Sequence, residues 1–137
     1  MDNWKKIWND REIEHGDDTL LSLIRLDGFD EGAGKISQVN WIEYVNWIGC
    51  KLDIDETDSI FEVGVGSGAF IYPFYKMGHK VAGIDYSSSL IKNIQITIPE
   101  MNFRCCEAIK LNVSKKFDVA ISNSVFQYFE SYEYLRG

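Results

Sequence analysis

Histidine and cysteine are scarce in this 137-residue sequence, which leaves almost no ligands for a zinc site. There are two histidines and three cysteines, and Cys50, Cys105 and Cys106 contain no C-x-x-C spacing. An odd number of cysteines, two of them adjacent, is typical of reduced thiols and not of a disulfide framework. We therefore expect a cytoplasmic protein without a metal centre.

Long apolar runs and clusters of positive charge are missing as well. No apolar run approaches the roughly 18 residues that a membrane span needs. The N-terminus, MDNWKKIWNDREIE, has neither the apolar core nor the cleavage site of a secretory signal. Fourteen Lys and Arg against 21 Asp and Glu give a net charge of −7, without a basic patch for nucleic acid. The sequence predicts no membrane partner and no nucleic-acid partner.

The residues that are present suffice for a folded core, because hydrophobic side chains make up 45% of the chain. The central stretch is residues 59–86, SIFEVGVGSGAFIYPFYKMGHKVAGIDY, which predicts a βαβ unit. The first expected strand is Ile60–Val63, and the glycine turn after it contains Gly64, Gly66 and Gly68. A helix then runs to about Met77, and the second strand, Val81–Ile84, ends on the carboxylate of Asp85. This arrangement is typical of a nucleoside-ligand site.

The spacing of the glycines fits two kinds of cofactor. Gly64-x-Gly66-x-x-Ala69 satisfies the dinucleotide fingerprint. Glu62-x-Gly64-x-Gly66-x-Gly68 satisfies the E/D-x-G-x-G-x-G pattern of S-adenosylmethionine-dependent methyltransferases. A carboxylate at the turn repels an anionic pyrophosphate and attracts a methionyl ammonium or sulfonium. Glu62 therefore favours the methyl donor.

Helical periodicity and turn residues predict the elements on either side of this unit. Residues 3–14 predict an amphipathic helix that packs on the domain or closes over the cofactor, and Asp27–Lys35 a loop that either connects passively or joins the acceptor pocket. The other expected elements are helices over 19–26, 38–52, 88–98 and 125–134, and strands over 102–106 and 117–122.

Four motifs, taken in order, resemble those of one enzyme family. FEVGVGSGAF looks like the first motif of the class I S-adenosylmethionine-dependent methyltransferases, VAGIDYS like the second, CCEA like the third and FDVAISNSVFQYF like the fourth. The resemblance runs from Ile60 to about Phe129 and covers the N-terminal, cofactor-binding half of the family's domain. It implies such a methyltransferase, or the cofactor-binding fragment of one, with S-adenosyl-L-methionine as its cofactor.

The resemblance also implies a fold and an acceptor. The expected fold is α/β, a Rossmann-like parallel sheet with flanking helices that is truncated after the fourth strand and preceded by an N-terminal helical segment. Residues 1–58 would form a helical cap region and residues 59–137 the partial cofactor-binding domain, within one structural unit. The N-terminal region and the motifs also look similar to methyltransferases of small-metabolite and bacterial surface-polysaccharide pathways. We therefore expect a small-molecule acceptor.

Residue roles carried over from the family divide the cofactor into two parts. Glu62 and the main chain of the three glycines, Gly64, Gly66 and Gly68, would hold the methionyl part. Asp85 would accept hydrogen bonds from both ribose hydroxyls, which a charged acceptor strengthens.

The remaining roles concern the adenine ring and the methyl group. Tyr86 would lie against the adenine face, and Glu107 and the Ala108 N–H would meet its polar edge. Asn123 would lie beneath the transferable methyl group. No catalytic residue can be named. His15 and Tyr128 are candidate bases, and each is otherwise an ordinary surface histidine or packed tyrosine.

The strand over residues 117–122 raises a question about partners. In the family this strand is central, whereas here the sequence ends soon after it and leaves an apolar edge. We expect either a longer parent protein or a second copy or partner chain over this edge. Two competing functions are a non-catalytic S-adenosylmethionine-binding or partner module and, ranked below it, an NAD-dependent oxidoreductase.

Overall fold

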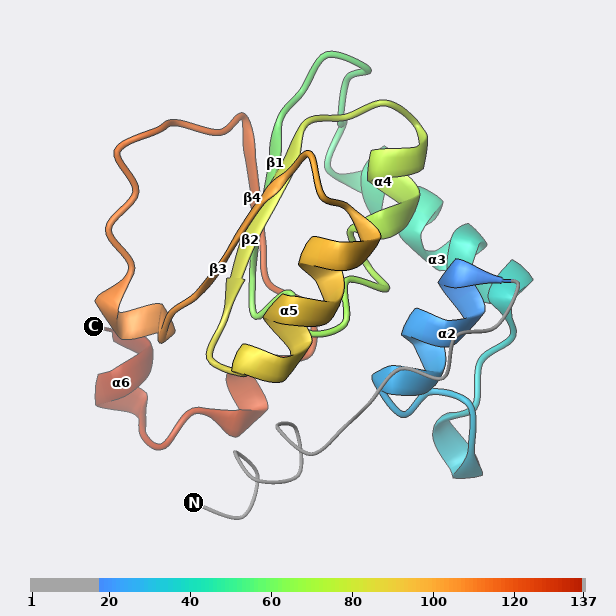
Figure 1. The fold of residues 1–137 in the computed structure, drawn as a ribbon, viewed down its shortest axis with the longest axis horizontal. Coiled ribbons are helices and arrows are strands. Elements are labelled where there is room, and N and C mark those ends of the chain that lie inside the picture. Colours follow the sequence, from blue (N-terminus) through green and yellow to red (C-terminus); the bar gives the residue numbers. More distant parts are fainter. Residues whose placement is uncertain (1–17, 137) are drawn as a thin grey trace.

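The computed structural model describes residues 18–136, which form a four-stranded parallel sheet with helices packed on it (Figure 1). The strand order is β3-β2-β1-β4, with β1 between β2 and β4. The strands are β1 Ile60–Val63, β2 Val81–Asp85, β3 Asn102–Cys105 and β4 Val119–Ile121. The predicted α/β fold with a Rossmann-like parallel sheet is confirmed. Within the described residues, β4 forms one edge of this sheet, as the sequence predicts.

Three of the helices begin at the side-chain caps that the sequence provides. Ser37 accepts from the N–H of Asn40 and starts α3, and Ser87 accepts from the N–H of Leu90 and starts α5. Asp18 caps α2 in the same way. These helices span Thr19–Leu26 (α2), Gln38–Lys51 (α3) and Ser88–Thr97 (α5). Because such caps are local, the sequence predicts where each helix begins.

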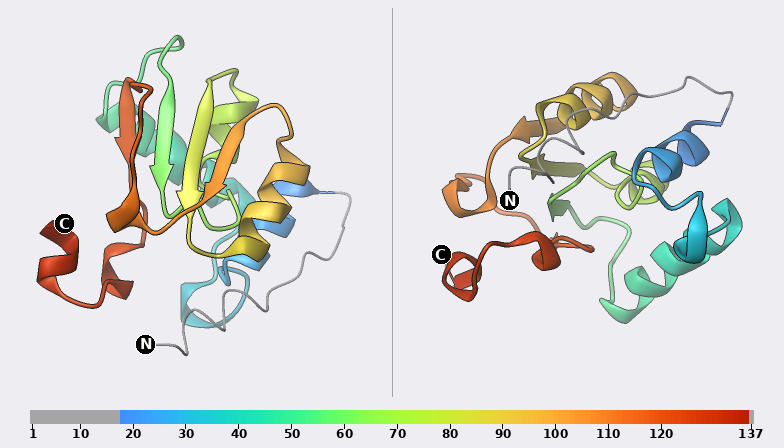
Figure 2. Two further views of the ribbon diagram at one scale, coloured as in Figure 1. Left: turned by 60° about the vertical axis from the view of Figure 1, so that its left-hand side comes forward. Right: turned by 90° about the horizontal axis from the view of Figure 1, so that it is seen from below.

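The two faces of the sheet are covered unequally. Side chains of α2, α3, α4 (Tyr72–Lys76) and α5 join strand residues such as Ile60 and Phe103 in one large core cluster. The opposite face carries a small cluster of Phe61, Ala82 and Ile84, which is covered from the loop that follows β3. Figure 2 shows α2, α3, α4 and α5 on one side of the sheet and this loop on the other.

The predicted helix to Met77 is much shorter in the structure, where α4 spans only Tyr72–Lys76. Pro73 has no N–H, so it cannot donate to the Ala69 carbonyl four residues earlier. The indole Nε1 of the buried Trp41 donates to that carbonyl instead, at 2.8 Å. The chain between the glycine turn and α4 therefore folds as turns.

The predicted helix over residues 125–134 is wrong in its first part. The structure has a short 3-10 helix, η3 (Phe126–Tyr128), and a separate helix α6 (Tyr132–Arg136) that begins where Ser131 accepts from the N–H of Tyr134. Neither helix buries a side chain. Two further 3-10 helices are η1 (Gly32–Gly34) and η2 (Ala108–Lys110).

Some predictions fall outside the described residues, namely the helix over residues 3–14 and the candidate base His15. Over residues 18–136 the structure contains no helix that is long and apolar enough to cross a membrane.

Candidate functional site

A pocket of about 440 Å³ opens at the carboxyl ends of β1, β2 and β4. Open parallel sheets bind their ligands at this end, because the connections that follow the strands gather there. Two walls face the cavity. The glycine-turn wall consists of residues 27–29, 62–66 and 84–86. The β4 wall consists of residues 123–125, residues 127–130 and Tyr134. Residues 106–108 close the side next to β3.

The turn after β1 is shaped by glycines and fixed to β2 by main-chain hydrogen bonds. The N–H groups of Gly64 and Val65 both donate to the Ile84 carbonyl, at 2.8 and 2.9 Å. Gly64 has φ +77°, a left-handed conformation that favours glycine. A Cβ there would lie 2.3 Å from Cγ2 of Val125 on the β4 wall. The two walls therefore touch at this point, and only glycine fits.

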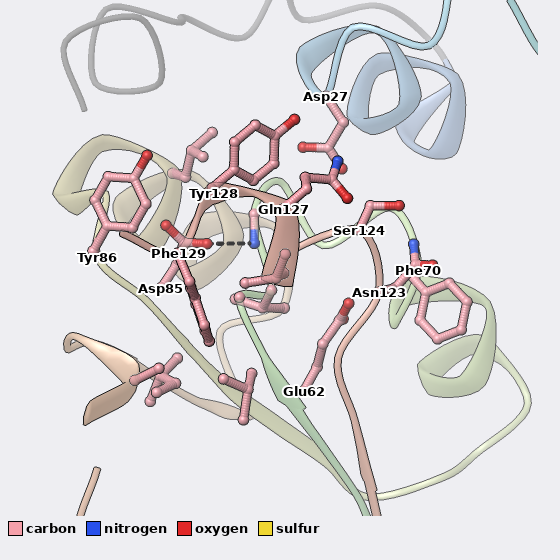
Figure 3. Close-up of a pocket in the computed structure, with 18 of the residues that line it drawn as sticks. Asp27, Glu62, Phe70, Asp85, Tyr86, Asn123, Ser124, Gln127, Tyr128 and Phe129 are labelled. Atoms are coloured by element: carbon pink, nitrogen blue, oxygen red, sulfur yellow. Dashed lines mark hydrogen bonds between the residues drawn. The ribbon is translucent and has the colours of Figure 1, made fainter. Parts of the chain in front are cut away.

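Asp85, at the end of β2, holds the turn from the other side. Its carboxylate accepts from the N–H of Gly66 at 3.0 Å and from the N–H of Ser87 at 2.8 Å (Figure 3). Burial raises the pKa of Asp85, and the hydrogen bonds from the main chain of Ser87, Gly66 and Tyr86 oppose that rise. The carboxylate is thus locked in one orientation at the pocket.

Glu62, on β1, lies deeper than Asp85 and is only 2% exposed. Its Oε2 has no hydrogen-bond partner among the described residues. Burial, and after it the negative charges of Asp27 and Asp85, raise the pKa of Glu62 well above the usual value of a glutamate. A buried carboxyl oxygen without a partner costs free energy unless a ligand supplies a donor. A cationic donor satisfies both the oxygen and the surrounding negative charge.

The charged side chains that line the pocket are all acidic among the described residues. Five carboxyl side chains line it, whereas no Lys, Arg or His among residues 18–136 does so; the five are Asp27, Glu62, Asp85, Glu107 and Glu130. Glu107 pairs with Lys110 at 3.4 Å on the protein surface, where such a pair contributes little. No three acidic, histidine or cysteine side chains of the described part are grouped so that they could hold a metal ion. The pocket as a whole attracts cations and repels anions.

Aromatic rings form much of the remaining lining. Tyr86 follows Asp85, and burial, with the neighbouring Asp85 and Tyr128, raises the pKa of its hydroxyl to about 12. On the β4 wall the rings of Phe129 and Tyr134 meet edge to face at 4.9 Å between centroids. Flat apolar rings beside carboxylates suit a ligand that combines an aromatic base with polar groups.

Eight of the nine residues predicted for the site line this one pocket: Glu62, Gly64, Gly66, Asp85, Tyr86, Glu107, Ala108 and Asn123. The ninth, Gly68, is not part of the lining. A Cβ at Gly68 would lie 2.4 Å from Cδ1 of Ile94, so its glycine lets α5 pack closely. The candidate base Tyr128 also lines the pocket, from η3. Asn123 is oriented by Tyr44 of α3, whose hydroxyl lies 2.9 Å from Asn123 Oδ1.

Sequence reasoning missed Asp27, which reaches the pocket from the end of α2. It stands in a loop that holds three acidic residues, DGFDE, and nothing in those letters singles it out. Its place depends on the docking of α2 on the glycine turn, where the Ser67 hydroxyl donates to the Leu23 carbonyl at 2.8 Å. Such a contact between distant residues leaves no local signal in the sequence.

Two solved methyltransferase structures have a similar fold. The magnesium protoporphyrin IX methyltransferase ChlM of Synechocystis PCC 6803, solved with bound S-adenosylmethionine, aligns with a TM-score of 0.57 and 18% identity over 97% of this chain and 60% of ChlM. DesVI of Streptomyces venezuelae aligns with a TM-score of 0.56 and 20% identity over 82% of this chain and 44% of DesVI. At these identities the likeness concerns the fold alone.

The family follows from the sequence matches. A family model described as a methyltransferase domain matches residues 61–136, more than half of the chain, and the chain therefore belongs to this methyltransferase-domain family. A protein of Invertebrate iridescent virus 6 named "Putative methyltransferase 235L" is 30% identical over 91 residues, which are 64% of this chain. The aligned part is 34% of the viral protein, so the chain corresponds to about a third of that relative.

Proposed function

We propose that this chain binds S-adenosyl-L-methionine and presents its methyl group to a small-molecule acceptor, as a methyltransferase or as the cofactor-binding part of one. The observation that carries the proposal is the charge of the pocket, which five carboxyl groups and no basic side chain of residues 18–136 line. Such a lining attracts a sulfonium and an ammonium group, whereas it repels the pyrophosphate of a dinucleotide. Membership of the methyltransferase-domain family supports the same ligand.

Three features of the site fit this cofactor. The unpartnered Oε2 of Glu62 offers an acceptor to a cationic donor. Gly64 and Gly66 bring main chain to the cavity without a side chain in the way. The carboxylate of Asp85, which accepts from the main chain of Gly66, Ser87 and Tyr86, keeps acceptor capacity for a ligand hydroxyl group.

The proposed roles follow the two ends of the cofactor. Glu62 and the glycine turn would hold the methionyl part, while Asp85 would accept hydrogen bonds from the ribose hydroxyls. Tyr86 would lie against the adenine ring, with Glu107 and the N–H of Ala108 at its polar edge. These assignments place each group beside a side chain that lines the pocket.

The bound cofactor would supply a methyl group on a positively charged sulfur, which an acceptor lone pair can displace in line. The chain's own contribution is to orient the two reactants and to exclude water, and orientation can supply on the order of 7–11 kcal/mol of the barrier. Asn123, held by Tyr44, would define the floor beneath the methyl group. Tyr128 lines the same pocket, and as a phenolate its oxygen is the candidate to accept the proton that the acceptor loses.

Isothermal titration of the folded chain with S-adenosylmethionine, S-adenosylhomocysteine and NADH tests the proposal. We expect the first two to bind and NADH not to bind. Asp85→Ala should lower the affinity for S-adenosylhomocysteine by about tenfold or more, because hydrogen bonds to a charged group contribute about 1.5–3 kcal/mol each. Binding of NADH alone would favour the oxidoreductase instead.

Asp118→Ala is the matched control for Asp85→Ala. The Asp118 carboxylate also accepts a main-chain N–H, from Ser59 at 2.7 Å, and it lies outside the pocket lining. This variant should bind as the unaltered chain does.

Transfer of a labelled methyl group to small-molecule amines and alcohols then separates an enzyme from a binding module, since a module binds the cofactor without turnover.

We also propose that a strand from a second copy or a partner chain covers the free edge of β4. Within the described residues β4 pairs with β1 alone, and Ala120 in its middle is exposed. Light scattering should show a dimer that Ala120→Pro dissociates, because proline interrupts edge pairing. A monomer at every concentration would contradict a second copy.

The three free cysteines fit the cytoplasmic location predicted from the sequence.

A further inference from the structure

We propose that Asp27 is a second anionic contact for the amino group of the bound ligand, so that helix α2 takes part in the cofactor site. This inference rests on the proposed function, and it adds a residue that no sequence motif identifies. Asp27 lines the same pocket as Glu62, and it comes from an element 35 residues earlier in the sequence (62 − 27).

The position of the Asp27 carboxylate is fixed by the glycine turn. Its Oδ1 accepts from the N–H of Ser67 at 3.0 Å, and it lies 3.1 Å from where a Cβ of Gly66 would stand. The carboxylate therefore lies directly against the turn. Figure 3 shows Asp27 reaching from α2 on a different side of the pocket from Asp85 and Tyr86.

Two features of the described residues disfavour a negative charge at Asp27. It is the C-cap of α2, and the C-terminus of a helix carries the negative end of the helix dipole. Its charge also repels that of Glu62 and raises the pKa of that carboxyl. An asparagine would accept the same hydrogen bond from Ser67 without either cost. A cationic ligand would offset both effects.

A cation between these groups would meet three sources of negative potential. They are the carboxylate of Asp27, the unpartnered Oε2 of Glu62 and the C-terminal carbonyls of α2. The amino group of the methionyl part is the cation of the proposed cofactor that also donates hydrogen bonds. Asp85 and Tyr86 serve the nucleoside end, so Asp27 should distinguish ligands by their amino-acid part.

Two ligands that share the nucleoside test this division. Isothermal titration would compare S-adenosylhomocysteine with 5′-methylthioadenosine, which lacks the amino acid. Asp27→Asn should weaken S-adenosylhomocysteine by about tenfold or more and leave 5′-methylthioadenosine within about twofold, because only the first ligand carries the ammonium group. Glu31→Gln, an exposed acid of the same loop that does not line the pocket, should change neither affinity.

The outcomes separate the two proposals. An equal loss for both ligands would mean that Asp27 only shapes the turn, and an unchanged affinity for S-adenosylhomocysteine would mean that it makes no contact; either result overturns the inference. Failure of the unaltered chain to bind either ligand would overturn the proposed function as well. If Asp27→Asn does not fold, Asp27→Glu keeps the charge and should keep the preference for S-adenosylhomocysteine; loss of that preference in this variant overturns the inference.

Discussion

The glycine-turn wall and the β4 wall face the same cavity, yet the fold supports them very differently. The first rests on two central strands and the large core, and Gly64, Val65 and Gly66 each donate a main-chain hydrogen bond to β2. The second follows an edge strand of three residues and continues into helices that bury no side chain. Phe126 and Tyr132 are 55% and 68% exposed there.

Because of this difference, we expect the two walls to have different roles. Few buried contacts and an exposed backbone allow a segment to open locally, whereas a wall built into the core opens only when the domain unfolds. The proposed cofactor groups stand mainly on the rigid wall. An acceptor that must enter and leave would do so past the β4 wall. The next three predictions test how far the two walls differ.

The largest effect is expected where the walls touch, at Gly64. Gly64→Ala places a Cβ 2.3 Å from Cγ2 of Val125 in a left-handed conformation. Backbone strain and overpacking together should lower the free energy of unfolding by about 2–4 kcal/mol. Denaturant titration measures this change.

Gly32→Ala is the control for the backbone strain at Gly64. Gly32 has φ +70°, and a Cβ there would meet no atom within 4 Å. Its substitution should therefore cost only the strain, and the difference between the two variants reports the contact with Val125. If both variants lose the same free energy of unfolding, Val125 moves aside without cost and the β4 wall contributes no packing at Gly64.

A smaller effect is expected from Glu62→Gln, and it depends on pH. Burial raises the pKa of Glu62, so the folded chain binds this proton more tightly than the unfolded chain. That contribution to stability is complete below the usual glutamate pKa, and it is lost as the pH rises through the raised pKa. Glutamine does not titrate and so does not lose this stability. At high pH the free energy of unfolding of the variant should therefore exceed that of the unaltered chain by about 1–3 kcal/mol.

Calorimetry from pH 5 to pH 8 checks this prediction for the rigid wall. The unaltered chain should become less stable relative to the variant as the pH rises. The same variant should also bind S-adenosylhomocysteine more weakly, because its neutral amide replaces a carboxylate. A constant difference in melting temperature over this range would show that Glu62 does not titrate there.

The smallest effect concerns the hydrogen bond that ties the β4 wall to α3. Tyr44→Phe removes the hydroxyl that lies 2.9 Å from Asn123 Oδ1, and the unfolding free energy should fall by about 0.5–1.5 kcal/mol. Hydrogen exchange should speed up over residues 123–129 and stay unchanged in β1 and β2. Tyr72→Phe, which removes a hydroxyl without a hydrogen bond to the described residues, should alter neither. Faster exchange in all strands would contradict separate walls.

The sequence predicts well the parts of this fold whose signals are local. The apolar runs of β1 and β2 and the serines before α3 and α5 lie within the elements that they define. The glycine turn and Asp85 are equally legible, because strand, turn and carboxylate follow one another along the chain. These site residues could therefore be named from local signals, whereas Tyr86, Glu107, Ala108 and Asn123 were named from the resemblance to the family.

What could not be predicted depends on contacts between distant residues. Pro73 is a local reason for the short α4, but the bond from Trp41 that occupies the Ala69 carbonyl spans 28 positions of sequence. Helical spacing in residues 125–134 suggested one helix, but this segment lacks a core to pack against and breaks at Ser131. Asp27 enters the pocket only because α2 docks on the turn.

Asp85 has two roles, one in the backbone of the turn and one in the cavity, and both matter for any redesign of the pocket. Its carboxylate fixes the main chain of Gly66 and Ser87 as well as facing the cavity. A substitution chosen to change ligand preference at this position would displace the very backbone that presents the neighbouring contacts. Glu107, whose side chain extends to Lys110 across the surface, holds no such main-chain group in the turn. Under the proposed assignment of Glu107 to the adenine edge, altered selectivity for the base of a nucleoside is therefore best sought at position 107, with position 85 left untouched.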